Sequence, residues 1–401
     1  MNPPASNHAA RLFFLDWVRI VAFFVLILYH VGMYYVSWDW HVKSPFASDA
    51  LEPYMMLSAP WRLGLLFLIS GVASSFMLAR VGAARFARQR SWRLLVPLLF
   101  GMLVIVPPQS YFEVVEKVGY AGGYGDFMRL YLTGYRGFCR EDCLIMPTWN
   151  HLWFVAYLWV YTMLLAALVP ALGARFEALA RGVANLLTGW KLIVLPAAVL
   201  AIARVALASR YPQTHALLGD WYSHANYLFL FVLGALLGRT PQVWVRFGAL
   251  RWASLGIALA CWATLLACFA IHDQGLPHDM PTLMLVIRSV HGLCAWSAIA
   301  AACGFAQRHL QFDGPARRYL TEAVFPVYIV HQTLIVSLAH AFKPLHRAPG
   351  LEAILLVVLT ITISFGIFEL VRSSALLRPL FGLARLPAPP NEKRPLVAGA
   401  A

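Results

Sequence analysis

The first apolar stretch of the chain, "LDWVRIVAFFVLILYHVGMYYV" at residues 15–36, carries three ionisable side chains suited to chemistry: Asp16, Arg19 and His30. A helix makes about three turns between Arg19 and His30, so the two share one face, ~16 Å apart along the axis. Asp16 precedes Arg19 by three positions and can pair with it. A neutral imidazole accepts a proton readily near neutral pH. We therefore predict that His30 acts as a catalytic base or in a proton relay.

A structural interpretation competes with this prediction. Arg19 would extend to the membrane surface, and His30 would only hydrogen-bond a neighbouring helix. Ionisable side chains at membrane depth are costly and usually functional, which favours the chemical interpretation.

A second basic segment, "RFARQRSWRLLVP", begins at residue 85 and leads into another apolar run. Arg90 and Arg93 are three positions apart, so they share a helix face where that run starts. Guanidinium groups in such a position bind phosphates or anionic lipid head groups. Membrane topology alone explains the two earlier arginines, Arg85 and Arg88. We predict that Arg90 and Arg93 bind an anionic ligand.

Further polar residues lie within or beside apolar stretches and are candidates for lining a cavity. Each also has a structural interpretation, as a small residue at a helix contact, an interfacial anchor or a polar pair between helices. His331, in "FPVYIVHQ", is expected to orient other groups rather than to act as the base. These candidates are Ser70, His151, Arg288, His291, Glu322, Tyr328 and His331.

The composition indicates an integral membrane protein. Of 401 residues, 60% are hydrophobic and only 12% are charged, and the mean hydropathy is +0.66. The net charge of +14 is spread over short segments between apolar runs, so no nucleic-acid partner is expected. A membrane-spanning helix needs roughly 20 apolar residues. Ten such spans are predicted, at 14–36, 59–79, 94–112, 151–172, 191–208, 224–238, 250–271, 282–305, 319–342 and 351–371.

The predicted fold is therefore an all-α, polytopic membrane bundle of about ten transmembrane helices. It occupies residues 1–380 and is followed by a disordered cytoplasmic tail, residues 381–401. Segments on the N-terminal side carry more than twice as many Lys and Arg residues as the opposite loops. By the positive-inside rule both termini are predicted to be cytoplasmic. We expect the membrane to be a bacterial inner membrane, with the opposite loops in the periplasm.

The cysteine and histidine spacing predicts no metal site. Cys139 and Cys143 lie in the long outer segment and could form a disulfide in an oxidising compartment, which the sequence leaves open. That segment, about residues 111–150, is rich in Gly, Tyr and acidic residues. It would suit a polar acceptor such as a sugar, and an ordinary connecting loop is the alternative.

Taken in order, these motifs resemble the acyltransferase 3 family of membrane-bound O-acyltransferases. The resemblance covers most of residues 11–371. It rests on "LDWVRIVAFFVLILYH", which matches the family's pattern of an arginine, ten residues and a histidine, and on "FLISG", "RSWRLLVP" and "FPVYIVHQ". With "HLWF", and with an expected absence of an appended soluble domain, the chain looks most like the glucan biosynthesis protein C branch. Members of that branch succinylate periplasmic glucans.

The resemblance implies transfer of an acyl group from cytoplasmic acyl-CoA to a hydroxyl of a periplasmic or surface glycan. Succinyl-CoA or acetyl-CoA would be the co-substrate, no cofactor would stay bound, and the glycan and the lipid bilayer would be the other partners. His30 would be the essential base, with Arg19 as its partner and Asp16 as the acidic residue before them. Arg90 and Arg93 would bind the donor.

Acyl transfer also needs a group that stabilises the oxyanion, and the sequence offers Arg19, Tyr328 or His331. Two other functions compete with this one. A proton-coupled transporter would use His30, Arg288, His291 and His331 as its pathway, and a non-catalytic component of a glycan-assembly complex would use them for contacts. The sequence leaves open the acyl group, the glycan, direct transfer or a covalent acyl-enzyme, and the oligomeric state.

Overall fold

The computed structural model describes residues 12–139, 143–276 and 279–385, and these residues fold almost entirely into helices. Within those ranges no β-strand occurs; the one isolated bridge joins Cys139 and Cys143. The all-α fold expected from the sequence is confirmed.

The first half of the chain contains seven α-helices in its described part, with short 3-10 turns before α2 and α7. The helices are α1 (Phe13–Tyr35), α2 (Glu52–Ser58), α3 (Arg62–Val81), α4 (Ala83–Phe100), α5 (Pro107–Val118), α6 (Tyr124–Leu132) and α7 (Trp153–Leu172). The second half continues with α8 (Ala174–Leu186), α9 (Lys191–Leu207), α10 (Trp221–Leu237), α11 (Val243–Asp273), α12 (Met280–His309), α13 (Pro315–Phe342), α14 (Pro349–Ser373) and α15 (Leu377–Leu380).

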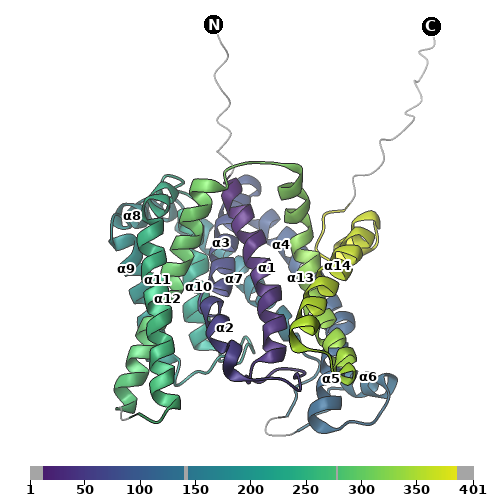
Figure 1. The fold of residues 1–401 in the computed structure, drawn as a ribbon. Coiled ribbons are helices and arrows are strands. Elements are labelled where there is room, and N and C mark those ends of the chain that lie inside the picture. Colours follow the sequence, from purple (N-terminus) through teal and green to yellow (C-terminus); the bar gives the residue numbers. More distant parts are fainter. Residues whose placement is uncertain (1–11, 140–142, 277–278, 386–401) are drawn as a thin grey trace, which may run out of the picture.

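The long helices stand side by side in one bundle (Figure 1), with α1 in the middle of the view. Helices α8, α9, α11 and α12 form one flank, and α13 and α14 form the other. Helix α1 begins and α14 ends at the same end of the bundle, which we call the terminal end. Helices α5 and α6 lie at the opposite end, which we call the loop end.

Eight helical segments in the described part of the chain are long and apolar enough to cross a membrane. Helices α8 and α9 pass the same test only as a pair bent by 111°, which would give nine, and α10 is a shorter apolar helix. The spans expected at 191–208 and 224–238 correspond to α9 and α10. The count of ten spans and the cytoplasmic position of both termini therefore stay predictions.

Two glycines allow α3 and α10 to pack backbone against backbone. A Cβ atom at Gly71 would lie 1.9 Å from the carbonyl oxygen of Phe231, and one at Gly234 would lie 2.0 Å from that of Leu68. Small residues permit such close crossings between membrane helices. This contact fixes the position of α3, which begins at Arg62.

The helical segment from residue 83 to residue 118 is interrupted near its middle. A π-helical turn, Gly101–Ile105, separates α4 from α5, which starts with Pro107. Such interruptions release backbone carbonyls for other partners. Here the carbonyl oxygen of Ile105 accepts a hydrogen bond from Thr333 Oγ1 at 2.7 Å, which ties this segment to α13.

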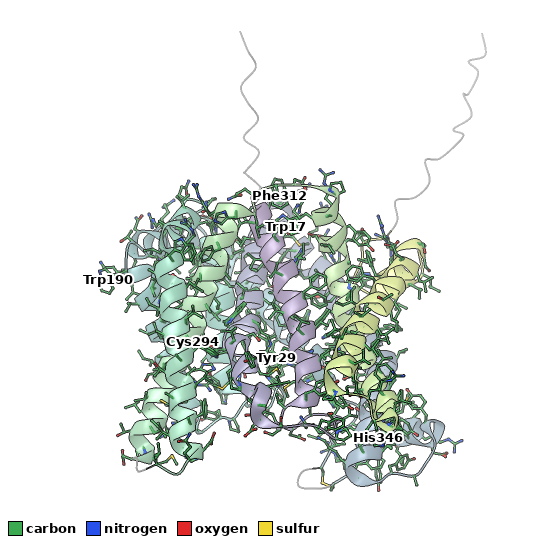
Figure 2. The ribbon with its side chains drawn as sticks, in the orientation of Figure 1. Trp17, Tyr29, Trp190, Cys294, Phe312 and His346 are labelled. Atoms are coloured by element: carbon green, nitrogen blue, oxygen red, sulfur yellow. A yellow bond between two sulfur atoms is a disulfide. The ribbon has the colours of Figure 1, made fainter. Side chains whose placement is uncertain are left out.

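An aromatic contact fastens α1 at the terminal end. Figure 2 shows Trp17 close to Phe312 at that end, with Tyr29 farther along α1. The indole N–H of Trp17 donates to the carbonyl oxygen of Phe312 at 3.2 Å, and the two rings are 5.1 Å apart. Tryptophan is common at such membrane boundaries. The contact holds Arg19 near the terminal end and His30 deeper in the bundle.

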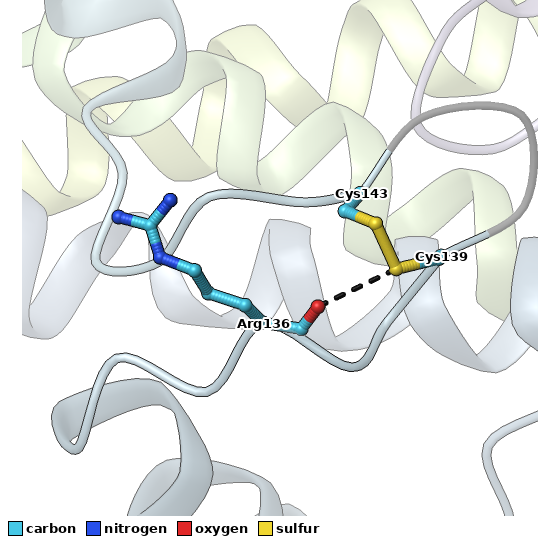
Figure 3. The surroundings of a disulfide bond; sticks show 3 residues. All are labelled: Arg136, Cys139 and Cys143. Carbon is cyan, nitrogen blue, oxygen red and sulfur yellow. Dashed lines mark hydrogen bonds between the residues drawn. A yellow bond between two sulfur atoms is a disulfide. The ribbon is translucent and has the colours of Figure 1, made fainter.

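The loop end carries a disulfide that the sequence left open. Cys139 and Cys143 are bonded, and Figure 3 shows the bond beside Arg136. The Sγ atom of Cys139 lies 3.4 Å from the carbonyl oxygen of Arg136. Acceptor binding by the segment around residues 111–150 stays a prediction.

The described part of the expected C-terminal tail packs against the bundle. Phe381 and Leu383 are buried, and the carbonyl oxygen of Gly382 accepts a hydrogen bond from Arg93 Nε at 3.1 Å. Residues 386–401, the rest of that expected tail, lie outside the described residues. Residues 381–385 thus help to build the wall around Arg93.

Candidate functional site

Two neighbouring cavities lie within the bundle. The histidine cavity, of about 430 Å³, lies toward the loop end and is lined by His30 and His151. The arginine cavity, of about 480 Å³, lies toward the terminal end and is lined by Arg19, Arg90 and Arg93. Both volumes fall within the ordinary range for small-molecule sites.

The two cavities meet at a partition of three side chains that line both of them: Leu63, Phe154 and Tyr328. These residues belong to α3, α7 and α13. Helix α1 runs past both spaces and contributes Arg19 to one cavity and His30 to the other, in agreement with their predicted shared face.

His30 is paired with a second histidine, His331 on α13. Its Nδ1 atom lies 2.8 Å from Nε2 of His331, and the rings are nearly parallel with centroids 5.0 Å apart. His331 is fully buried, with 0% of its surface exposed, and its Nδ1 lies 2.6 Å from the carbonyl oxygen of Tyr328. Only the fold brings this pair together, because the two residues are 301 positions apart.

The partners of the pair decide which nitrogens carry protons. A carbonyl oxygen only accepts, so Nδ1 of His331 donates to Tyr328. In a neutral His331, Nε2 is then the acceptor, and Nδ1 of His30 donates to it. Nε2 of His30 keeps its lone pair, and no described residue hydrogen-bonds it. Since His30 lines the histidine cavity, this tautomer suits it to accept a proton from a bound group.

A third histidine, His151, has both ring nitrogens engaged. Nε2 donates to the carbonyl oxygen of Ile329 at 3.1 Å, and Nδ1 accepts from the side-chain amide of Gln109 at 3.4 Å. The His151 and His331 rings stand perpendicular, with centroids 5.3 Å apart. The hydroxyl of Tyr328 donates to the carbonyl oxygen of His151. This arrangement suits His151 to hold its neighbours in place.

A chain of hydrogen bonds connects this centre to the loop end. The side-chain amide of Gln332 lies 3.1 Å from Gln109 Oε1 and 3.0 Å from His41 Nε2. Nδ1 of His41 lies 2.6 Å from a carboxylate oxygen of Glu113, which pairs with Lys117 at 3.0 Å. Buried networks whose members are satisfied fix side-chain geometry.

His215 adds a flat surface to the histidine cavity. It lies in the loop between α9 and α10 and stacks on Trp153, with ring centroids 4.1 Å apart. Burial lowers the pKa of the His215 imidazole, and Asp220 opposes that shift. The neutral ring is therefore favoured at this position.

The arginine cavity gathers guanidinium groups from three parts of the chain. Arg90 Nη2 donates to Ser74 Oγ at 2.6 Å, and Arg93 Nε donates to the carbonyl oxygen of Gly382. Arg378, which pairs with Glu322 at 3.1 Å, lines the same cavity. A guanidinium has five N–H donors, so Arg90 and Arg93 retain donors for an anion.

Asp16 lies between two arginines at the terminal end. Its Oδ1 is 3.3 Å from Arg19 Nη2, and its Oδ2 accepts a hydrogen bond from Arg317. Arg317, which is only 1% exposed, also pairs with Asp313 at 2.7 Å. These contacts tie α1 to the start of α13, the two helices that carry the histidine pair. A catalytic role for Asp16 stays a prediction.

Most residues singled out by sequence come together at these cavities. Arg288 and His291, on α12, line neither of the two, and His331 reaches the site through its bond to His30. The functional roles of all of them stay predictions. The arginine cavity is lined by Asp16, Arg19, Ser70, Arg90, Arg93, Glu322 and Tyr328, and the histidine cavity by His30, His151 and Tyr328.

Sequence reasoning missed Arg62, His41 and Gln109. Arg62 lines the histidine cavity but sits at the edge of the apolar segment 59–79, where an arginine is ordinarily a surface anchor. His41 and Gln109 meet at Gln332, which is 291 and 223 positions away from them. No local spacing could have revealed these contacts.

Comparisons with known proteins point to one family. A family model described as an acyltransferase domain matches residues 12–369. The chain is 26% identical to a glucans biosynthesis protein C from Salmonella heidelberg over 85% of this chain and 86% of the relative. It is 24% identical to a glucans biosynthesis protein C from Escherichia coli O6:K15:H31 over 98% of this chain and 100% of the relative. No solved structure matches the chain significantly.

Proposed function

The chain belongs to this acyltransferase family, and from that premise we propose that it transfers a succinyl or acetyl group from cytoplasmic acyl-CoA to a hydroxyl of a periplasmic or surface glycan. One observation carries the proposal: a cavity lined by arginines and a cavity lined by a histidine base meet at the partition of Leu63, Phe154 and Tyr328. Such an arrangement suits two substrates that arrive from opposite sides of a membrane.

The arginine cavity is proposed to receive the acyl-CoA. Arg90 and Arg93 would bind its phosphates, because guanidinium groups recognise phosphate through paired, charge-assisted hydrogen bonds. The thioester arm would extend past the partition toward His30. This assignment makes the terminal end cytoplasmic, in agreement with the positive-inside bias of the sequence.

The histidine cavity is proposed to receive the glycan hydroxyl. Nε2 of His30 takes the hydroxyl proton while the oxygen attacks the thioester carbonyl and forms a C–O bond. The tetrahedral intermediate then breaks its C–S bond, and the departing thiolate takes the proton from His30. The alternative, in which a protein side chain first carries the acyl group, uses the same base.

His331 is proposed as the positioning residue for His30. Its Nε2 accepts the His30 Nδ1–H bond, which fixes the tautomer of His30 and supports the positive charge that His30 gains during the reaction. His151 and Gln109 would in turn hold the surrounding backbone and amide groups.

The acceptor is proposed to be a glucan. The relatives from Salmonella heidelberg and Escherichia coli are named for glucan biosynthesis, and an osmoregulated periplasmic glucan would reach the histidine cavity from the loop end. The aromatic residues Trp149 and Trp153 line that side of the cavity.

Reconstitution of the full chain in sealed vesicles would test the proposal. Acyl-CoA is added on the terminal side and glucan is enclosed on the loop side, and both coenzyme A release and the mass of the glucan are measured. We expect acyl-CoA-dependent coenzyme A release that equals the acyl groups gained by the glucan. Coenzyme A release without a glucan mass shift, or solute flux without thioester cleavage, would contradict it.

A further inference from the structure

We infer that Arg62 is a further catalytic residue, whose guanidinium binds the negatively charged oxygen formed on the thioester carbonyl during acyl transfer. The inference rests on the proposed function and adds the group that the reaction needs besides the base. Such a group is required because attack on a carbonyl places negative charge on its oxygen.

Within the described part of the chain, Arg62 is a buried cation without a counterion. It is 6% exposed, and its Nε and Nη1 atoms have no hydrogen-bond partner in the described part of the chain. No carboxylate among the described residues forms an ion pair with it, in contrast to Arg19 and Arg378. A buried guanidinium in this state is costly, and such residues within membrane proteins are usually retained for function.

The position of Arg62 connects it to the base. Its guanidinium carbon lies 3.2 Å from the centre of the Tyr29 ring, and Tyr29 directly precedes His30 on α1 (Tyr29 is labelled in Figure 2). Arg62 and His30 line the same cavity. The ring face holds the cation by a cation–π contact.

The groups that the sequence offered for this role are engaged elsewhere. The Tyr328 hydroxyl donates to the carbonyl oxygen of His151, and both ring nitrogens of His331 already have partners. Arg19 lines the arginine cavity, on the other side of the partition. Arg62 is therefore the cation that lies on the same side of the partition as His30.

The chemistry then follows in two stages, addition and elimination. As the hydroxyl proton moves to Nε2 of His30, the hydroxyl oxygen forms a bond to the thioester carbon, the C=O electron pair moves onto the carbonyl oxygen, and Arg62 holds the resulting oxyanion. The pair returns to the carbonyl when the C–S bond breaks, and the leaving thiolate takes the proton from His30. Arg62 exchanges no proton in either stage; it acts as a fixed positive charge in a site of low dielectric constant.

The test compares Arg62→Gln, Arg62→Met and Arg62→Lys with the wild type in nanodiscs, using acetyl-CoA and succinyl-CoA as donors and glucan as acceptor. Arg204→Gln is the matched control, because Arg204 is also partly buried within the bundle but bonds Tyr222 and lines neither cavity. The measurements are kcat, the KM for each donor, and the thermal unfolding midpoint.

We expect kcat of Arg62→Gln and Arg62→Met to fall about 10²–10³-fold with both donors, the loss typical of one oxyanion-stabilising group. KM should change little, and Arg62→Lys should retain intermediate activity because it keeps the charge. The unfolding midpoint should stay unchanged or rise, since the variants remove a buried, unpaired charge. Arg204→Gln should keep the wild-type kcat.

Three results would overturn the inference. A wild-type kcat in Arg62→Gln would show that Arg62 has no catalytic role. A fall in kcat confined to succinyl-CoA would show that Arg62 binds the acyl carboxylate. Failure of all three variants to fold would show that Arg62 is structural. If the wild type itself transfers no acyl group to glucan, the proposed function fails instead, which separates the two claims.

Discussion

The polar side chains of the arginine cavity and those of the histidine cavity have different kinds of partners. In the arginine cavity, Arg19 and Arg378 pair with nearby carboxylates close to the terminal end. In the histidine cavity, His30 is bonded to another histidine, His331, and Arg62 lies beside it without an ion-pair partner among the described residues. The first pattern suits recognition of a charged ligand, and the second suits groups that must keep one geometry during a reaction.

This contrast predicts that substitutions in the histidine cavity change kcat, whereas those in the arginine cavity change the KM for the donor. The partition explains why the two effects should separate. Leu63, Phe154 and Tyr328 separate the two cavities, so under the proposed function they lie between the part that would bind the donor head group and the part that would hold the reacting atoms.

His30→Ala should lower kcat by roughly 10²–10⁴-fold, because it removes the proposed base. The measurement is acyl transfer to glucan by protein in nanodiscs, with folding checked by thermal unfolding. His291→Ala serves as the control, since His291 lies on α12 and lines neither cavity. Normal acylation by the folded His30→Ala protein would show that His30 is not the base and that the histidine cavity is not the site of acyl transfer.

His331→Ala should lower kcat by about 10-fold to 10²-fold, a smaller loss because the base itself remains but is no longer held. His331→Gln can offer an amide oxygen to Nδ1–H of His30 and should recover part of the activity. The pH profile of kcat should shift in His331→Ala, since the imidazolium of His30 loses its acceptor. An unchanged pH profile with unchanged kcat would argue against the positioning role.

The double variant Arg90→Ala, Arg93→Ala should raise the KM for acyl-CoA roughly 10-fold to 10²-fold, with kcat at saturation largely retained. The measurement is the initial rate over a range of donor concentrations. Arg85→Ala, Arg88→Ala provides the control, because neither of those arginines lines the arginine cavity. An unchanged KM in the double variant would show that Arg90 and Arg93 serve only to orient the protein in the membrane.

Replacing the cysteines of the loop end, Cys139→Ser and Cys143→Ser, should have the smallest effect on activity. The disulfide closes only a short loop, and neither cysteine lines either cavity, so its loss should cost about 2 kcal/mol of stability and leave kcat nearly unchanged. Thermal unfolding and acyl transfer measure the two quantities separately. A large fall in kcat would show that the loop around Arg136 contributes to the functional site.

Local patterns predicted the placement of several candidate residues. The spacing of Arg19 and His30 placed them on one face of α1, and the face does run past both cavities. The spacing of Arg90 and Arg93 likewise puts them on one face of α4, and both line the arginine cavity. Both placements have the same cause: residues on one helix obey a fixed periodicity, whatever surrounds that helix.

The sequence by itself determined the all-helical fold, most of the apolar spans and the identity of the proposed base, because hydropathy and helical periodicity are local properties. Only the tertiary structure decided the pairing of His30 with His331, the free nitrogen that this pairing leaves, and the position of Arg62 beside Tyr29. Contacts between α1, α3 and α13 join residues up to 301 positions apart, and no local pattern encodes such distances. A proton's position on His30 is therefore a property of the packed bundle and not of the helix that carries it.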